Sequence, residues 1–442
     1  MFRPPPKPSA GAEGDKENLI IPRDPLGILM DAMWGLIGEL HETSHATSPE
    51  EAKNATLVEA IQKSELFLDA FAELPERYHD ALKGVPQFIE NMEAAPLVAS
   101  SAESDYTKAG VSLLEYAIDD FDGDQVFLQD GYTPIIQELA RPLEDAGVID
   151  TGSEVTKIDY SGPTITISAK HNTYHTSHAV VTTPLGILKH SHTTLFTPSL
   201  PSPKIDAIKS LGFGTLDKIF LIYPSAWWAQ EPYHSIFKAG KRLNVLSSGD
   251  HPDPVAGDTI DTFMGFTHYL SGLSINPSPN SAVEPGPRIL SYINLHALTG
   301  YSVLGIFVSC ANALAIENMT NAEAKHFAHR TFVSWLPKHL PAPPEPSDVH
   351  VTRWAQDEFS RGSYSHMIAG VSDKGCREEF GKPVRSGSGD GVGNWASGGG
   401  EVRFAGEHTS EEHFATAHGA LLSGWREADG IIAAMGKAGD GA

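Results

Sequence analysis

The sequence predicts a mixed α/β (α+β) protein with two domains. Its 442 residues are long for a single hydrophobic core, and chains of this length usually divide. After residue 24, apolar residues recur at three- and four-residue spacing, which indicates helices, whereas short apolar strands recur from residue 155 onwards. In residues 403–429 a strand, an acid, a loop and a long helix follow one another, an order typical of a ligand site.

The first part of the chain is predicted to be an arm followed by helices. Residues 1–24 are rich in proline and glycine, which predicts a flexible arm. Asp24 and Pro25 have the residue types of an N-cap and a first helical position, and Ser48 and Pro49 repeat this pattern. Further helical patterns lie at 57–74, 86–92 and 111–118.

An acidic loop separates these helices from the strands. Residues 119–124 read DDFDGD, and two interpretations stay open: a collar that attracts a cation, or a solvated turn. Beyond it, the patterns predict a helix at 134–143 and strands at 155–160, 164–169 and 179–183. The last strand ends in Thr182, Thr183 and Pro184. Such a strand end is where an α/β sheet usually presents a ligand crevice, although it is also how a strand stops at a proline turn.

Lys218 stands at the start of another apolar strand, residues 219–222. Burying an ammonium group is unfavourable unless other groups hold it, so a lysine here is either functional or solvated. Further along, the pattern of residues 320–336 predicts a helix with Thr320 as its N-cap and Glu323 in its first turn.

The segment 403–429 contains the strongest ligand signal. A short strand breaks at Gly406, Glu407 follows directly, and a helical pattern restarts at Thr416 with Ala417 and other small residues along one side. A carboxylate accepts hydrogen bonds from hydroxyls, and a helix N-terminus attracts an anion. The pair therefore suits a cofactor that carries both hydroxyls and phosphates.

The AGEHT block at 405–409 and the run ATAHGALLSGWREA at 415–428 resemble the C-terminal flavin motif of the flavin-dependent amine oxidases. This family includes polyamine oxidases, lysine-specific histone demethylases and, more distantly, monoamine oxidases. Further similar motifs lie at 182–189, 212–218 and 354–365, so the resemblance runs from about Asp105 onwards. The family opens with a strand and a GxGxxG turn for the pyrophosphate, which this chain lacks. The spelling GVGNWA at 391–396 follows no strand and reads as a flexible loop.

The resemblance implies a two-domain flavin amine oxidase-like fold. It assigns 125–199 and 391–438 to an incomplete, Rossmann-like FAD-binding domain that lacks its first βαβ unit. It assigns 25–124 and 200–390 to a substrate-binding domain made of a mixed sheet and helices.

The resemblance also implies roles for particular residues. Lys218 would bind a water next to flavin N5, Tyr364 would stand against the flavin face, and Thr416 would leave a wide substrate throat. Ser363 stands where monoamine oxidases carry a flavin-linking cysteine, which implies noncovalent attachment. The residues implied to bind FAD are Val155, Thr182, Thr183, Pro184, Trp354, Phe359, Gly406, Glu407, Thr416 and Ala417.

Net charge and composition indicate which classes of partner the chain could bind. A formal charge of −24 argues against nucleic acid and suits a cationic substrate, although it also serves solubility alone. The two cysteines supply no disulfide framework, and no Cys/His spacing predicts a metal site. Neither a secretory signal nor an apolar run of about 20 residues is visible, so we expect no membrane partner and a cytoplasmic or nuclear location.

The implied reaction is FAD-dependent oxidation of an amine of the spermine and spermidine class to an imine and then an aldehyde, with O2 reduced to hydrogen peroxide. Methyl-lysine is the second substrate candidate. Two alternatives remain: a catalytically inactive relative that binds a cationic partner such as a histone tail, and a truncated form of an ordinary polyamine oxidase. The sequence leaves open the oligomeric state and the C–N bond attacked.

Overall fold

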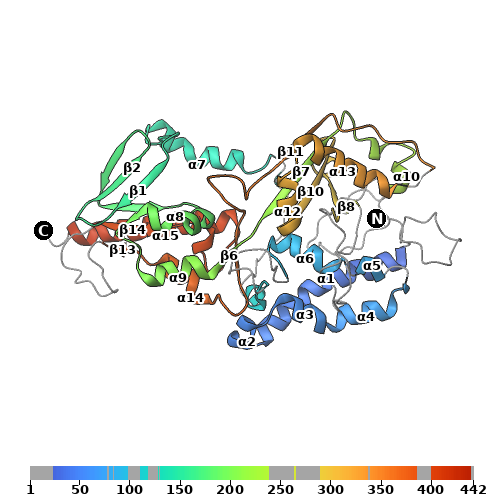
Figure 1. Cartoon of the computed structure of the whole chain (residues 1–442), viewed down its shortest axis with the longest axis horizontal. Coiled ribbons are helices and arrows are strands. Elements are labelled where there is room, and N and C mark those ends of the chain that lie inside the picture. The colour runs from blue at the N-terminus through green and yellow to red at the C-terminus, as the bar shows by residue number, and fades with distance from the viewer. Residues whose placement is uncertain are drawn as a thin grey trace.

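The chain forms two lobes that lie side by side (Figure 1). The structure is a computed structural model that describes residues 23–76, 79–82, 84–97, 110–117, 128, 130–237, 263–264, 289–336, 339–385 and 400–439. The acidic run 119–124, the 391–396 segment and residues 1–22 of the predicted arm lie outside the described residues. The fold combines helices with four separate sheets, which confirms the predicted mixed class.

A helical layer forms the lower part of one lobe (Figure 1). It consists of α1 (Arg23–Ala46), α2 (Pro49–Asn54), α3 (Leu57–Lys63), α4 (Glu65–Glu73), α5 (His79–Leu82), α6 (Val85–Glu93) and the 3-10 helix η2 (Leu113–Ala117). The predicted helix at 57–74 is two helices, because the Ser64 hydroxyl accepts from the Phe67 amide at 3.0 Å and begins a new one. Residues 113–117 form a 3-10 helix in place of an α-helix.

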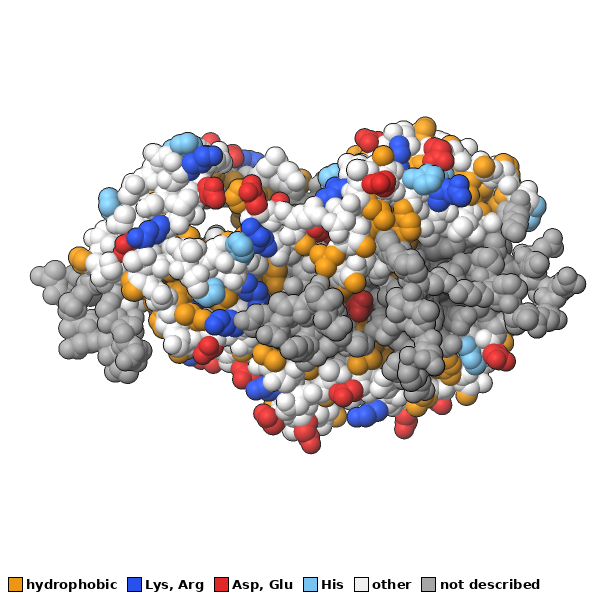
Figure 2. Space-filling view, in the orientation of Figure 1, with side chains coloured by type: hydrophobic (Ala, Val, Ile, Leu, Met, Phe, Trp, Pro, Cys, Tyr) orange, Lys and Arg blue, Asp and Glu red, His pale blue; other side chains and the backbone are white. Residues whose placement is uncertain are grey.

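These helices pack around their own core, which includes Leu36, Leu57, Phe67 and Ile89, all nearly inaccessible to solvent. Their outer face is acidic. Acidic side chains gather over α2, α3 and α4 along the lower edge of the view in Figure 2. In α3 and α4 the buried side chains include Leu57, Ile61 and Phe67, whereas Glu59 and Asp69 are exposed, as the three- and four-residue spacing predicts.

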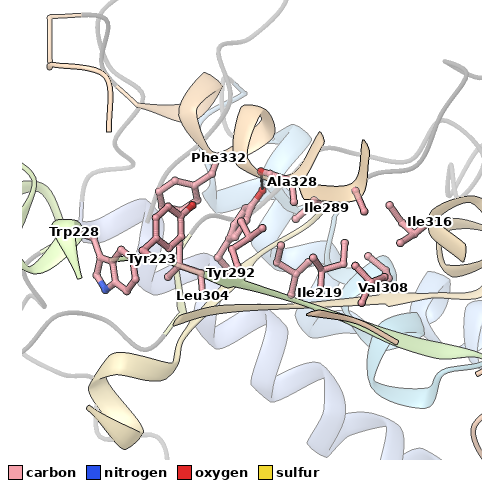
Figure 3. Packing of buried hydrophobic residues seen from close by; sticks show 14 of the residues in the cluster. Ile219, Tyr223, Trp228, Ile289, Tyr292, Leu304, Val308, Ile316, Ala328 and Phe332 are labelled. Carbon is pink, nitrogen blue, oxygen red and sulfur yellow. Dashed lines mark hydrogen bonds between the residues drawn. The ribbon is translucent and has the colours of Figure 1, made fainter. Parts of the chain in front are cut away.

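An antiparallel five-stranded sheet forms the upper part of the same lobe, in the order β11-β7-β10-β9-β8. Its strands are β7 (Leu216–Ile222), β8 (Phe263–Met264), β9 (Tyr292–Asn294), β10 (Val303–Ser309) and β11 (Asp348–Val351). The helical elements joined to it are η3 (Trp227–Ala229), α10 (His234–Phe237), α11 (Leu295–Thr299), α12 (Cys310–Glu317) and α13 (Asn321–Trp335). Tyr292 and Phe332 pack edge to face in its core (Figure 3). The predicted cap of α13 is confirmed, because Thr320 and Glu323 form a reciprocal capping box.

The other lobe holds two smaller sheets. The strands β1 (Val155–Asp159), β2 (Ile165–Ala169), β3 (Thr173–Thr176) and β5 (Phe196–Thr197) pair in the order β3-β2-β1-β5. The strands β4 (His178–Val181), β13 (Val384–Arg385) and β14 (Glu401–Phe404) pair in the order β13-β14-β4. The helices are α7 (Thr133–Asp145), α8 (Leu185–Leu195), α9 (Ser202–Ser210), α14 (Lys374–Gly381), the 3-10 helix η4 (Glu407–Thr409) and α15 (Ala417–Gly439).

One core unites this lobe, and it includes Ile208 of α9 and Phe380 of α14 with Val402 and Phe404 of β14. Both α9 and α14 fall in the range 200–390, which is predicted to be substrate-binding domain, and yet they share this core with β14. The domain limits stay a prediction.

A two-stranded ribbon joins the lobes. It pairs β6 (Leu211–Phe213) antiparallel with β12 (Ser365–Met367). The turn after β6 approaches the end of α6 so closely that a Cβ on Gly214 would lie 1.9 Å from the carbonyl oxygen of Ala94. Only glycine leaves room for this approach.

We predict that Gly214→Ala lowers the free energy of unfolding by about 1–3 kcal/mol, because the added methyl group overlaps the Ala94 carbonyl. Gly424→Ala is the matched control: its new Cβ would meet nothing within 4 Å, and alanine favours the helix by about 0.5–1 kcal/mol. Urea unfolding of both variants measures the difference. Equal effects at the two positions would contradict the steric argument.

Candidate functional site

The carboxyl ends of β4 and β14 meet at one edge. The two strands are parallel with Val181 opposite Phe404, and the Ala405 amide donates to the Val181 carbonyl at 3.0 Å. Residues 182–184 leave β4 at this edge, and residues 406–407 leave β14 beside them. The structure therefore brings five of the predicted cofactor residues together where a parallel pair presents a crevice.

Thr183 contributes an unsatisfied hydroxyl at this edge. Its Oγ1 is buried, and among the described residues it has no hydrogen-bond partner. Its neighbours Thr182 and Pro184 are exposed. Because buried hydroxyls are normally satisfied, this oxygen is available to a ligand or a water molecule.

Gly406 makes the turn after β14 tight. Its φ is 142°, and a Cβ there would lie 2.7 Å from the His408 ring. Its amide donates to the Ser423 hydroxyl of α15 at 2.8 Å. The turn thereby holds the strand end against the helix.

The Glu407 carboxylate accepts three hydrogen bonds. The Ser365 amide and hydroxyl donate to it at 3.1 and 2.7 Å, and the Ala415 amide donates at 2.8 Å. A carboxylate offers about four acceptor positions. Within the described part of the chain, these three donors fix the orientation of the group and leave one acceptor position for a ligand hydroxyl.

Arg377 reaches this carboxylate indirectly, through the Ser365 hydroxyl, and was not predicted as a site residue. Its side chain is 1% exposed, its Nη1 donates to the Ser365 hydroxyl at 2.7 Å, and its guanidinium lies 4.0 Å from the Phe414 ring centroid. Ser365 therefore accepts from Arg377 and donates to Glu407. Arg377 lies on a short helix in an otherwise ordinary charged stretch, so no local signal distinguished it.

Tyr364 is joined to the turn that precedes Lys218. Its carbonyl accepts from the Gly214 amide at 2.9 Å, and its hydroxyl donates to the Met92 carbonyl of α6 at 3.0 Å. Burial raises the pKa of the tyrosine hydroxyl well above its ordinary value, so the hydroxyl remains protonated.

Lys218 lies on β7, on the face that is opposite to the core. Its Nζ is 5.5 Å from the centroid of Phe307, its partner across the β7–β10 ladder. Burial lowers the pKa of this lysine, and the neighbouring Asp217 carboxylate partly offsets the shift. Backbone hydrogen bonds of residues 363–365 thus connect Glu407 with the Gly214 turn, which precedes the strand of Lys218.

Trp354 and Phe359 lie in the turn that returns the chain to β12. Trp354 is 40% exposed and its carbonyl accepts from the Gly362 amide at 2.8 Å; Phe359 is 58% exposed. Gly362 has φ 138°, and a Cβ there would lie 2.5 Å from the Phe213 ring. The turn therefore lies tightly against β6, with both aromatic side chains partly accessible.

Thr416 is the N-terminal cap of α15. Its Oγ1 accepts from the Gly419 amide at 3.0 Å and donates to the His413 carbonyl at 2.7 Å. Ala417 is the first residue of the helix. The hydroxyl of Thr416 thus makes two hydrogen bonds to the backbone, so only its methyl group is available to line a neighbouring substrate space.

Val155 is placed apart from these residues. It begins β1 in the other sheet of the lobe and is 41% exposed. Its predicted contact is through the backbone, which a strand end leaves accessible.

Two further properties concern the described ranges only. In them, no group of three or more His, Cys, Asp or Glu side chains could hold a metal ion. No helix in the same ranges combines the length and the apolar character needed to cross a membrane.

Comparison with known proteins gives a consistent result. A family model described as flavin containing amine oxidoreductase matches residues 24–432. Lysine-specific histone demethylase 1 homolog 1 of Arabidopsis thaliana is 30% identical over 310 residues, which are 70% of this chain and 30% of that protein. Peroxisomal N(1)-acetyl-spermine/spermidine oxidase of Homo sapiens is 30% identical over 255 residues, 58% of this chain and 42% of that protein. The match spans less than half of each relative.

Among solved structures, putrescine oxidase bound to putrescine is similar over 96% of this chain and 80% of that chain, with a TM-score of 0.55 and 15% sequence identity. At this identity the likeness concerns the fold alone.

We predict that Thr416→Ala destabilises the chain by about 1 kcal/mol, because the Gly419 amide loses its capping oxygen. Thr416→Ser keeps the hydroxyl and should keep most of the stability. Thermal unfolding of the two variants in parallel checks this, and an equal loss in both would show that the methyl group matters more than the cap.

Proposed function

Because the chain belongs to the flavin-containing amine oxidoreductase family, whose model matches residues 24–432, we propose that it binds FAD noncovalently and oxidises an amine of the spermine and spermidine class. Oxygen is the proposed acceptor and hydrogen peroxide the proposed product. The observation that carries the proposal is the shared edge of β4 and β14, where Thr183 and Glu407 present polar oxygens.

The residues at this edge fit the hydroxyl-bearing part of such a cofactor. The Thr183 hydroxyl lacks a partner among the described residues, and the Glu407 carboxylate has an acceptor position left. The N-terminus of α15, at Ala417, belongs to the same region and suits an anionic group. These groups would hold the cofactor in the proposed site.

Noncovalent binding is supported by the residue before Tyr364. Ser363 stands there, and a serine cannot form a thioether link. Its amide donates to the Gly214 carbonyl at 2.8 Å, and its hydroxyl hydrogen-bonds to the backbone of Leu216. The side chain is therefore engaged in joining the two lobes.

The chemistry that a bound flavin supplies is acceptance of a hydride equivalent from the α C–H of a neutral amine. In the proposal, Lys218 places a positive charge beside the reacting centre, and Tyr364 directs the substrate amine through its ring electrons. The lowered pKa of Lys218 agrees with a partly desolvated position. Trp354 and Phe359 would cover the cofactor from the turn that follows β11.

The substrate class is supported by two observations. One relative is named as an oxidase of acetylated spermine and spermidine, and the net charge of −24 attracts polycations from solution. The other relative is named as a histone demethylase, so a methyl-lysine peptide is the competing substrate in any test. The proposed location is cytoplasmic or nuclear, and neither nucleic acid nor a membrane is a proposed partner.

We predict that the purified chain carries the absorption spectrum of an oxidised flavin and releases hydrogen peroxide when given spermine. A dimethyl-lysine histone peptide at the same concentration should release much less. Denaturation should free the flavin, because no covalent link holds it. A protein that stays colourless after incubation with FAD would overturn the proposal. If only the histone peptide is oxidised, the substrate is methyl-lysine and not a polyamine.

We also predict that Lys218→Met lowers the rate of peroxide release by about 100-fold, since a charge next to the reacting atoms is removed. Lys218→Arg keeps the positive charge and should lose much less. The flavin content of both variants should match that of the parent. Equal losses in the two variants would show that charge is not what Lys218 supplies.

A further inference from the structure

Two buried carboxyl groups lie close to Lys218: Asp217, its neighbour on β7, and Glu317 at the end of α12. Asp217 is fully buried, and its Oδ1 accepts from the Thr352 hydroxyl at 2.8 Å and from the Trp354 amide at 3.1 Å. Its Oδ2 is also buried, and no N–H or hydroxyl group of the described residues donates to it. An ionised oxygen in that position would be strongly unfavourable.

Glu317, the last residue of α12, completes the arrangement. It is 3% exposed, and its two oxygens accept from the Ala355 amide at 2.7 Å and from the Gln356 amide at 3.0 Å. Three successive amides, of residues 354, 355 and 356, therefore donate to just two acids.

The amides of Trp354 and Ala355, which donate to Asp217 and Glu317 respectively, are consecutive, so the two buried carboxyl groups lie beside each other. Because two adjacent buried carboxylates repel each other when both are ionised, one proton held between them is favoured. That proton supplies the partner that Asp217 Oδ2 otherwise lacks. Burial first, and the adjacent Asp217 second, raise the pKa of Glu317 to about 7.

The cations nearby do not replace the proton. Lys218 follows Asp217 on β7, but alternation along a strand sends its side chain to the opposite face. Arg353 donates to the backbone carbonyls of Glu317 and Met319, at 3.3 and 2.8 Å, and so is committed to the end of α12.

Other ionisable side chains on the neighbouring elements are engaged elsewhere. On β11, Asp348 and His350 pair with Ile222 and Phe220, farther along β7 than Asp217. Along α13, Glu323 closes its own capping box and Lys325 donates to the Pro346 carbonyl at 3.4 Å. His329 contacts the Tyr223 hydroxyl and the Glu345 carboxylate, and His326 and Arg330 are exposed. The strand β10 carries no ionisable residue.

We propose that Asp217 and Glu317 form a positioning pair that shares one proton and holds the segment 352–356, with Trp354, against the strand of Lys218. The pair does not touch the reacting atoms. It acts by fixing the backbone that carries Trp354, a predicted cofactor residue, and by bracing the strand that carries Lys218, a predicted catalytic residue.

The pair makes its hold on the segment 352–356 sensitive to pH, and this hold weakens as pH rises. The pKa of Glu317 is about 7 in the folded chain, against an ordinary value of 4.5. Its stabilising contribution is therefore complete below about pH 4.5, declines above that, and is lost as pH rises through 7. Above that pH two adjacent buried carboxylates repel each other, and the 354–356 amides lose protection.

Hydrogen exchange of the full chain tests this directly, without any need for flavin or activity. After correction for the intrinsic pH dependence of exchange, protection of the amides of 354–356 should fall about tenfold between pH 6 and pH 8. The amides of α13 in the same sample serve as the control for global opening. Failure of the proposed function would leave this result unchanged, so the two are tested separately.

Asp217→Asn is the decisive variant. Its amide oxygen still accepts from Thr352 and Trp354, while its NH2 group donates to Glu317 and replaces the shared proton. Protection of 354–356 should then be the same at pH 6 and pH 8. A fall equal to that of the parent would overturn the proposal.

Glu317→Gln provides a second measurement should the first variant fold poorly. Its amide nitrogen cannot accept from a backbone N–H, so one of the Ala355 and Gln356 bonds is lost at every pH. We expect lower protection that no longer depends on pH. The proposal would also be overturned if protection of the 354–356 amides still fell with rising pH in this variant. The same holds if protection did not fall with pH in the parent.

Discussion

The parallel pairing of β4 with β14 is the contact on which the candidate site depends. It places Val181 opposite Phe404, and so residues 182–184 and 406–407 leave the sheet at the same edge although more than 200 positions separate them in sequence. A slip of one residue would turn the side chains of β14 to the other face and displace Glu407. The buried aromatic contact between Phe196 and Phe404 supports this register from the core.

Buried charges, each held by several partners, give the site its rigidity. Arg377 reaches Glu407 through Ser365, while Asp217 and Glu317 hold the backbone around Trp354. Lys204 does the same for the lobe core, where its ammonium donates to carbonyls at the end of α14 and burial lowers its pKa to about 7. A buried charged group without partners costs free energy, so conformations in which these side chains lose their hydrogen bonds are disfavoured.

Local chemistry made some elements predictable. The capping box of Thr320, the cap of Ser48 and the helix after Thr416 follow from residue types at fixed short spacings. The strand β3 was missed, because its sequence TYHT is polar and exposed and lacks the alternation that marks a strand. The unpredicted Arg377 and Glu317 lie in ordinary helical sequence, and only their distant partners reveal them.

By itself, the sequence determined the mixed fold class, the family and the places of several helices and strands. These depend on interactions between residues close together in the chain, or on motifs that can be read directly. Only the tertiary structure decided which acids are buried together and which arginine supports Glu407. Those contacts join residues brought together by strand pairing, and a hydrogen bond between Glu317 and the Ala355 amide leaves no periodic trace in the sequence.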